Sequence, residues 1–368
     1  MRPENLSLNP SQKQALAQIR ARRAASRSEL AQAIGVSAPA MTKIARDLIE
    51  MGLAVEAGRT DNPRGAPSTK LAVAPEGAFS VGVFVEIDAL SFAILDLTGK
   101  AVWQTRMTAD NADPKETVAR IAEQAARAVA ERTPSPDRVL GVGVAASGAF
   151  VEDRRTFATP RGMESWRSVD VASLFEDALE RPVILENDAT AAALGELLIA
   201  GKGAPQSYFY IYFGNGLGAG HILNGQAMRG AFGNAGEIGM LAPPPLARPT
   251  LKSLSERFGR PLGETTAEDI DAMFADGRLE FMAWLDEGVD NLETPLRAVI
   301  ALLDPDAILL GGRLPPPVLD YIAVKLQTSA SCRRGFGLPS PTISLAQVNG
   351  ADAAVYGAAS LPLLEMTA

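Results

Sequence analysis

The stretch "PVILENDATAAALGELLIAG", residues 182–201, indicates the fold class of this chain. Its first part is an apolar run typical of a buried strand, and the remainder predicts a helix that Asn187 and Asp188 open. Polar side chains at the carboxyl end of such a strand point into a cleft in α/β proteins. Asp188 can act there as a general base toward a hydroxyl or accept hydrogen bonds from a polyol. The alternative is that Asp188 only caps the helix.

Residues 79–368 continue the same alternation of strands and helices. The pattern predicts three strands over 79–107 with a Thr98-Gly99 turn, and an amphipathic helix over 113–132. Buried strands are predicted within 139–146 and 302–312, and a glycine-rich hairpin over 207–225. Helices that alternate with buried strands are typical of layered α/β proteins.

The glycine run "FGNGLGAGH", residues 213–221, allows two interpretations. Its alternate glycines, from Gly214 to Gly220, would let backbone amides face a phosphate. The other interpretation is a hairpin turn around Asn215-Gly216. His221 follows the run among apolar neighbours, which favours a strand residue over a ligand.

Charge is distributed unevenly along the 368 residues. Residues 1–70 carry eleven Lys or Arg against six Asp or Glu, whereas the whole chain carries a formal charge of −8. A basic N-terminal part on an acidic body suggests nucleic acid as a partner of that part only. The lone Cys332 excludes an intrachain disulfide, and the lone His221 leaves little scope for metal binding. No apolar run is long enough for a membrane span, so a cytoplasmic protein is expected.

The basic N-terminal part has the pattern of a winged helix-turn-helix. "SELAQAIGVSAPAMTKIARDL", residues 28–48, reads as helix, turn with Gly35, and helix, while residues 53–74 read as strand, basic tip and strand. The second helix would enter the major groove by its N-terminal end, and the tip would meet phosphates or the minor groove. The expected DNA-contacting residues are Ser37, Ala38, Pro39, Thr42, Lys43, Arg46, Arg59 and Arg64. The alternative is a three-helix protein-interaction module.

Taken together, these motifs resemble the ROK family of repressors, open reading frames and sugar kinases, in its subgroup with an N-terminal winged helix. The resemblance rests on residues 26–56, "RGAPSTKLAV", "ENDATAAALGE", "GNGLGAGHILNGQAMRGAFGNAGEIGM" and "LLDPDAILLGGRL", and covers almost the whole chain. It implies an actin-like sugar-kinase fold of two α/β lobes around a cleft. The expected division is a winged helix over 1–75, a first lobe over 79–187 plus 349–368, and a second lobe over 188–348.

The chain departs from the kinases of this family at the ATP-phosphate loop. Those kinases begin the first lobe with Asp-x-Gly-Gly-Thr, where this chain has Phe84 for the aspartate, Glu86 and Ile87 for the glycines, and Asp88 for the threonine. Two carboxylates would then face triphosphate oxygens, and the amide donors would be lost. Asn215 also replaces the usual Thr or Ser of the second phosphate loop. ATP binding and kinase activity are therefore not expected.

The chain also departs from the family's zinc site. The family has Glu-x-Gly-His followed by a cysteine cluster, whereas here Met240 follows Glu237-Ile238-Gly239 and no cysteine lies nearby. Without an imidazole or a thiolate a tetrahedral zinc site cannot form. Neither a metal nor a cofactor is expected.

The sugar-contact residues of the family are kept in part. Asn187, Asp188 and Glu237 match the family's hexose-binding and base positions, and Ser147-Gly148 replaces a usual Pro-Gly. "ATPRGMESW", residues 158–166, replaces the family's Asn-containing loop, which argues for a more apolar or differently substituted ligand than glucose. The alternative is a vestigial cleft whose residues only stabilise the packing of the lobes.

These observations predict a transcriptional regulator of the repressor class that senses a sugar or sugar derivative. The resemblance implies a homodimer or tetramer that places two winged helices on a double-stranded, pseudo-palindromic operator. One alternative is an active sugar kinase with a DNA-binding head. Another is a regulator controlled by a protein partner that docks on "LAPPPLARP", residues 241–249, although a proline-stiffened connection explains that stretch equally.

Overall fold

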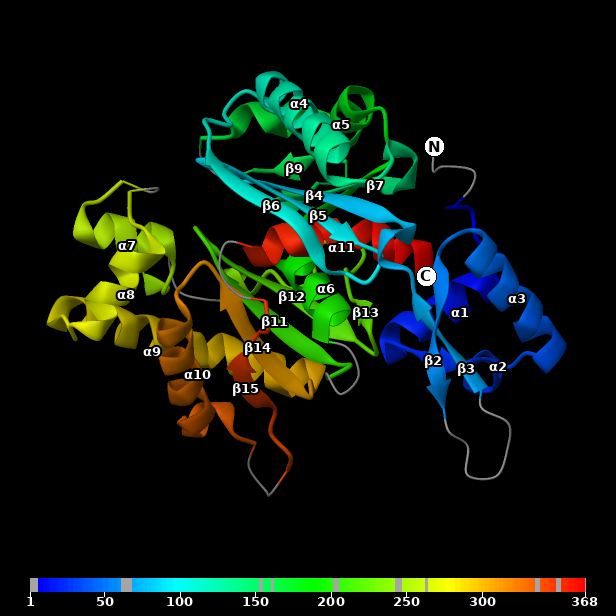
Figure 1. Cartoon of the computed structure of the whole chain (residues 1–368). Coiled ribbons are helices and arrows are strands. Elements are labelled where there is room, and N and C mark those ends of the chain that lie inside the picture. Colours follow the sequence, from blue (N-terminus) through cyan, green and yellow to red (C-terminus); the bar gives the residue numbers. More distant parts are fainter. Residues whose placement is uncertain are drawn as a thin grey trace.

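The computed structural model describes residues 6–60, 68–151, 155–159, 162–200, 205–241, 247–261, 264–334, 338–348 and 352–367. Two α/β layers stack on each other, and a small N-terminal head lies beside them (Figure 1). Within the described ranges, no helix is both long and apolar enough to cross a membrane.

The head consists of three helices and a three-stranded sheet. The helices are α1 (Pro10–Arg22), α2 (Arg27–Ile34) and α3 (Ala38–Glu50); the strands are β1 (Ala25–Ser26), β2 (Ala54–Thr60) and β3 (Ser68–Val73), in the order β1-β3-β2. Each helix begins at a side-chain cap, formed by Asn9, Ser26 and Ser37, respectively. Gly35 ends α2 with a φ of 70°, as expected for a left-handed cap. The predicted order of helix, turn, helix and two strands is present.

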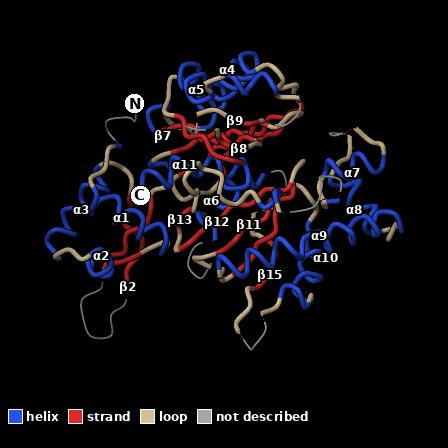
Figure 2. Tube along the Cα trace, turned by 180° about the vertical axis from the view of Figure 1, so that it is seen from behind, coloured by secondary structure: helices blue, strands red, loops and turns tan. Residues whose placement is uncertain are grey.

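The first lobe is built on a mixed five-stranded sheet in the order β10-β7-β4-β5-β6. Its strands are β4 (Phe79–Val85), β5 (Ala89–Asp96), β6 (Ala101–Thr108), β7 (Val139–Ala146) and β10 (Val183–Asn187). β4, β5 and β6 pair antiparallel, whereas β7 and β10 join the sheet in parallel. Helices α4 (Pro114–Arg132) and α5 (Val171–Leu179) cover its outer face, and the short strands β8 (Ala149–Phe150) and β9 (Phe157–Ala158) form a separate pair (Figures 1 and 2).

The second lobe repeats this topology in the order β13-β12-β11-β14-β15. Its strands are β11 (Tyr208–Phe213), β12 (Leu217–Leu223), β13 (Gln226–Ala227), β14 (Ala307–Gly312) and β15 (Thr342–Leu345). This lobe also contains helices α7 (Leu251–Phe258), α8 (Ala267–Ala275), α9 (Leu279–Leu303) and α10 (Pro316–Thr328). A core around Phe281, Trp284 and Leu292 of α9 fills the space beneath this sheet.

Two helices, α6 (Asp188–Ala200) and α11 (Asp352–Thr367), lie between the sheets (Figure 2). They cross at Gly195 and Gly357, where a Cβ on Gly357 would lie 1.9 Å from the Ala191 carbonyl oxygen. α11 approaches the first sheet equally closely, because a Cβ on Gly143 would lie 1.9 Å from the Ala358 carbonyl oxygen. Glycine at these positions therefore permits direct backbone contact, which couples α6, α11 and the first sheet closely.

The head is docked directly on the body. Arg20 of α1 donates hydrogen bonds to the Leu363 carbonyl (3.3 Å) and to Thr367 Oγ1 (2.9 Å), both in the last turns of α11. Arg138, which precedes β7, donates to the carbonyl oxygens of Met51 (2.8 Å) and Gly77 (3.1 Å). One continuous buried core includes residues of the head, α6 and α11. The last turns of α11 are therefore in direct contact with the head.

Candidate functional site

A cleft between the lobes, with a volume of about 690 Å³, contains all five residues that the sequence singled out for ligand binding. Asn187 and Asp188 lie where β10 meets α6, Ser147 and Gly148 follow β7, and Glu237 lies on the second lobe. These residues are up to ninety positions apart in the chain, and the packing of the two sheets brings them together. We call this cavity the interlobe cleft.

Asn187, not Asp188, is the principal cap of α6. Asn187 Oδ1 accepts from the amides of Ala189 (2.9 Å) and Thr190 (3.1 Å), which is the geometry of an N-cap, and its Nδ2 donates to the Gly148 carbonyl. Asp188 Oδ1 accepts from the Ala189 amide as well, at 2.8 Å, but Oδ2 accepts from the Ser147 hydroxyl at 2.7 Å. Asp188 therefore contributes to the cap of α6 through one oxygen and bonds to Ser147 across the cleft wall through the other.

Burial changes the acidity of both carboxyl groups in the cleft. The pKa of Asp188 is raised to about 6, chiefly because the side chain is desolvated, with smaller contributions in the same direction from Glu237 and Glu86. The hydrogen bonds from Ser147 and Ala189 act in the opposite direction. Desolvation also raises the pKa of Glu237. Asp188 can thus hold or release a proton slightly below neutral pH, which suits hydrogen bonding to a hydroxyl.

Tyr212 is a cleft residue that sequence reasoning missed. It comes from β11 and is 2 % exposed, and its hydroxyl is buried with no hydrogen-bond partner among the described residues. Burial raises its pKa well above the usual value, so the group is a neutral O–H donor. A buried donor without a partner costs about 1–3 kcal/mol, which a ligand oxygen would recover. The continuous aromatic and aliphatic run around Tyr212 indicates only a buried strand, so no local signal distinguishes it.

The wall beneath Glu237 does not fit a zinc ion. Met240 is 85 % exposed, so its side chain lies in solvent and not against the cleft. Arg248 donates to the Gly239 carbonyl at 2.5 Å and braces the turn from the protein side. Among the described residues, no three His, Cys, Asp or Glu side chains are grouped closely enough to hold a metal. No step of the chemistry is therefore assigned to a metal.

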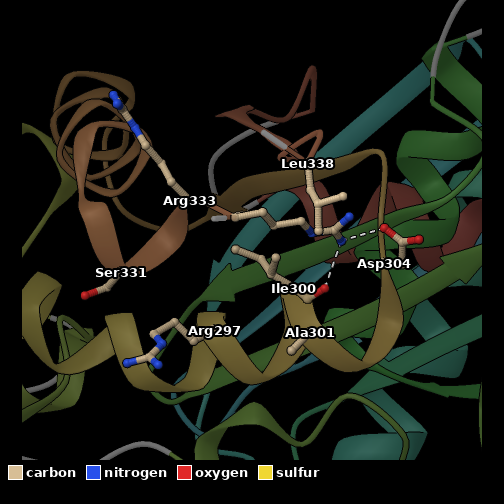
Figure 3. Close-up of a pocket in the computed structure, with 8 residues that line it drawn as sticks. Arg297, Ile300, Ala301, Asp304, Ser331, Arg333 and Leu338 are labelled. Atoms are coloured by element: carbon tan, nitrogen blue, oxygen red, sulfur yellow. Dashed lines mark hydrogen bonds and ion pairs between the residues drawn. The ribbon is translucent and has the colours of Figure 1, made fainter. Parts of the chain in front are cut away.

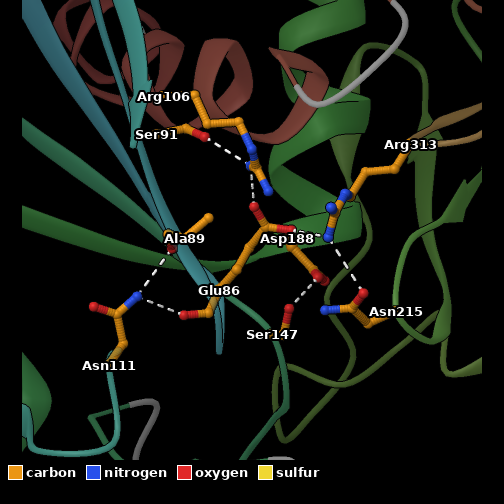
Figure 4. Close-up of polar contacts among 9 residues, drawn as sticks. All are labelled: Glu86, Ala89, Ser91, Arg106, Asn111, Ser147, Asp188, Asn215 and Arg313. Atoms are coloured by element: carbon orange, nitrogen blue, oxygen red, sulfur yellow. Dashed lines mark hydrogen bonds and ion pairs between the residues drawn. The ribbon is translucent and has the colours of Figure 1, made fainter. Parts of the chain in front are cut away.

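Glu86 joins the two lobes through a buried ion-pair network (Figure 4). Its carboxylate, 2 % exposed, binds Arg106 of β6 and, at 2.8 Å, Arg313 of the second lobe. Arg313 also donates to Asn215 Oδ1 at 3.2 Å. Of the two carboxylates expected in this loop, Glu86 has its charge compensated by two guanidinium groups.

Two further cavities accompany the cleft. One, of about 900 Å³, is lined by Asp88, Arg106, Thr265 and Arg313, and contains two buried atoms without hydrogen-bond partners in the described structure, Asp88 Oδ1 and Thr265 Oγ1. The other, of about 450 Å³, lies near the end of α9 among Arg297, Asp304 and Arg333 (Figure 3). Neither contains a residue predicted for ligand binding, although Asp88 was expected beside the phosphate loop.

The glycine run forms the hairpin that was one of its two interpretations. β11 and β12 pair antiparallel, and the last pair before the turn is Phe213 with Leu217. The connecting residues 214–216 have no left-handed φ. Asn215-Gly216 therefore does not form the turn with two positive φ angles that is typical of this dipeptide. His221 is a buried residue of β12, as predicted. Residues 242–246 of the proposed docking stretch lie outside the described residues.

The expected DNA-contacting residues of α3 form one exposed face. Met41, Ile44, Ala45 and Leu48 are buried against the head, whereas the opposite face is exposed. That exposed face consists of Ser37, Ala38, Pro39, Thr42, Lys43 and Arg46. Thr42 Oγ1 donates to the Ala38 carbonyl, and Arg46 lies 3.7 Å from Glu50. The side chains of Arg59 and Arg64 lie outside the described part of the structure.

Comparison with known proteins agrees with this architecture. The "Uncharacterized protein y4fQ" of Sinorhizobium fredii is 27 % identical over 92 % of this chain and 87 % of its own length. A xylose repressor of Bacillus subtilis is 25 % identical over 58 % of this chain, which spans about half (55 %) of that repressor's length.

Solved structures share the fold. A ROK family transcriptional regulator, a homologue of the Escherichia coli MLC protein, superposes with a TM-score of 0.72 at 21 % identity and covers 97 % of this chain and 96 % of its own. A ROK family glucokinase from Streptomyces griseus superposes with a TM-score of 0.62 at 22 % identity, over 77 % of this chain and 99 % of its own. The profile of the ROK family matches residues 81–251. The two mixed sheets are thus those of the actin-like sugar-kinase fold, and residues 81–251 of this chain are similar to the ROK family.

Proposed function

We propose that this protein is a ligand-responsive transcriptional repressor that binds an operator through its head and a sugar or sugar derivative in the interlobe cleft. The observation that carries the proposal is the presence of an exposed α3 face and a polar cleft in one chain whose head and body share a buried core. Its similarity to xylose repressors supports the same assignment. The domain boundaries we propose are a winged helix over 1–75, a first lobe over 79–187 with 349–368, and a second lobe over 188–348.

The head suits duplex DNA because its exposed helix face is small, polar and basic. The N-terminal end of α3 can approach base edges through Ser37, Ala38 and Pro39, since none of them has a bulky side chain. Lys43 and Arg46 follow on the same face and are available to phosphates. The connection between β2 and β3 carries further basic residues, Arg59 and Arg64, that we assign to the wing.

The repressor assignment is preferred over a sugar kinase because of the Glu86 network. A nucleotide phosphate bound between the lobes would compete with the Glu86 carboxylate for Arg106 and Arg313, and would bring its own negative charge beside Glu86 and Asp88. Incubation of the purified protein with ATP and a panel of hexoses tests this assignment. Phosphoryl transfer at a typical enzymatic turnover of about 1 per second or more would establish the kinase instead.

The proposed signal passes from the cleft to the head through two helices. Asp188 opens α6, α6 crosses α11 at Gly195 and Gly357, and α11 ends on Arg20 of the head. A ligand that binds one lobe arrangement better than the other would shift the population of the two arrangements. A hundredfold difference in affinity, about 2.7 kcal/mol, makes a usable switch.

The operator contact is proposed to involve two heads. A homodimer, or a tetramer built from dimers, would set two α3 helices on successive major grooves of a pseudo-palindromic site. A change in lobe closure would alter the spacing of the heads and thereby weaken operator binding.

Fluorescence anisotropy with labelled DNA from upstream of the protein's own coding sequence tests the proposal. The protein is titrated at fixed salt with unlabelled competitor DNA, and sugars, amino sugars, sugar acids and polyols are then added to the complex. Competitor-resistant binding that one compound class reverses is the expected result. Absence of specific binding, with and without these compounds, would remove the DNA-binding assignment.

A further inference from the structure

The second-lobe wall of the interlobe cleft presents basic side chains. Arg248 and Lys252 both line the cleft, on either side of Thr250. Thr250 caps α7 by accepting from the Ser253 amide, and the neighbouring Leu251 amide donates to the Gly214 carbonyl of the hairpin at 3.0 Å. These two contacts fix the first turn of α7, and Lys252 with it, beside the tip of the hairpin.

Lys252 carries a positive charge that no neighbouring carboxylate compensates among the described residues. Within the described ranges its ammonium group has neither a hydrogen bond nor a carboxylate at ion-pair distance, although the side chain is half-buried. Arg248 adds a second positive charge to the same wall while it donates to the Gly239 carbonyl. Glu256, one turn after Lys252, is exposed at the rim. A negatively charged group of a ligand would meet Lys252 first.

The other residues of the cleft are suited to hydroxyl groups. Asn187 and Asp188 keep their bonds to Gly148 and Ser147, and Glu237 lies across from them on the second lobe. Tyr212 adds a buried O–H donor without a protein partner in the described structure. Acceptors and one neutral donor together match a polyhydroxyl ring, whose hydroxyls both donate and accept.

We propose that the effector is a sugar that carries an anionic substituent, a carboxylate or a phosphate, bound with its hydroxyls at Asn187, Asp188, Glu237 and Tyr212 and its anionic group at Lys252 and Arg248. This inference rests on the proposed sugar-sensing function and names its ligand class. A neutral hexose would leave Lys252 without a counter-charge. An amino sugar whose amine occupied the same end of the cleft would place a further ammonium group beside Lys252 and Arg248.

Isothermal titration calorimetry on the full chain tests the inference with matched ligands. Glucose and galactose are compared with glucuronate and galacturonate, which differ from them by one carboxylate, and glucose 6-phosphate and glucosamine are added. A charge-assisted contact strengthens binding, so at least one anionic sugar is expected to bind about tenfold or more tightly than its neutral parent. Uronates and the sugar phosphate then distinguish the two sources of negative charge.

Variants of the full chain separate the anion contact from the rest of the cleft. Lys252→Gln is expected to lose about tenfold in affinity for the anionic sugar and to change neutral-sugar binding little, whereas Lys252→Arg retains the preference. Glu256→Gln is the matched control on the same helix and the same cleft, and should not weaken anion binding. Tyr212→Phe should weaken anionic and neutral sugars alike.

Each other outcome overturns a defined part of the reasoning. Equal or tighter binding of the neutral parents or of glucosamine, or an unchanged affinity in Lys252→Gln, overturns the anionic class and leaves sugar sensing intact. If no sugar of any charge binds while the operator is still bound, the inference fails together with the sugar-sensing part of the proposed function.

Discussion

Arg20 is the residue at which the proposed signal leaves the sensor body, and replacing it with methionine should uncouple the head. The guanidinium donates to the Leu363 carbonyl and to Thr367 Oγ1 in the last turns of α11. Burial lowers its pKa to about 10, so the group remains charged at neutral pH. Hydrogen bonds from a charged donor contribute about 1.5–3 kcal/mol, and a cation at a helix C-terminus contributes about 0.3–1 kcal/mol. We therefore expect Arg20→Met to weaken docking of the head by about 2–3 kcal/mol.

Two measurements are needed, because docking and signalling are separate properties. Amide hydrogen exchange in α1 should accelerate by about thirtyfold or more, the equivalent of 2 kcal/mol. The ratio of operator affinities without and with effector should fall from about a hundredfold toward tenfold or less. Arg22→Gln is the matched control, since Arg22 carries the same charge on the same helix but donates to Gln18 within the head.

The outcomes separate cleanly. Faster exchange with an unchanged effector response would refute α11 as the route of the signal. Unchanged exchange would refute the magnitude assigned to the Arg20 contacts. A loss of effector response in Arg22→Gln of the same size would assign the effect to head charge rather than to docking.

Three further predictions concern the DNA face, the cleft and the helix crossing. Lys43→Gln should reduce the slope of log operator affinity against log salt concentration by about 0.9, the value for one phosphate contact. The control Lys115→Gln, at an exposed position of α4, should leave this slope unchanged. Equal slopes in the two variants would remove Lys43 from the DNA interface. Because the folded pKa of Asp188, about 6, lies above the usual 3.8, the folded state binds more protons than the unfolded state between these values, and this group destabilises the fold as pH rises from about 4 to 6. Asp188→Asn should therefore gain about 2–3 kcal/mol relative to wild type between pH 4 and pH 7.5 in urea unfolding, and parallel pH profiles would contradict the shift. Gly357→Ala should lower the free energy of unfolding by about 3 kcal/mol or more, because its Cβ would lie 1.9 Å from the Ala191 carbonyl oxygen. Gly216→Ala, whose Cβ would have no atom within 4 Å, should be nearly neutral in thermal unfolding. Similar losses in the two variants would contradict the close helix crossing.

Much of the head could be predicted from sequence because its signals are local. The helix-turn-helix order and its turn at Gly35 were predicted from residues 28–48, and the structure ends α2 at Gly35 and begins α3 after the Ser37 cap. The β10–α6 junction was predictable for the same reason, although the cap falls on Asn187 and not on Asp188. Caps, glycine stops and helical periodicity act over one or two turns, so a linear sequence displays them.

The cleft was predictable only in part. Asn187, Asp188, Glu237, Ser147 and Gly148 were expected from the resemblance and do line one cavity. Tyr212 and Lys252 were missed, because a tyrosine in a buried strand and a lysine in a first helical turn are ordinary features of a sequence. What distinguishes them is that, among the described residues, the Tyr212 hydroxyl has no hydrogen-bond partner and the Lys252 ammonium group has no carboxylate at ion-pair distance.

By itself, the sequence determined the alternation of strands and helices, the helix-turn-helix order of the head, and the loss of the zinc-binding side chains, since each depends on residue type and short spacing. The tertiary structure alone decided that Glu86 is neutralised by Arg106 and by Arg313, a residue 227 positions away, and that α11 ends against Arg20 of the head. Burial, ion pairing and pKa depend on distances between segments that are remote in the chain. Those distances exist only once two sheets and two central helices have packed together.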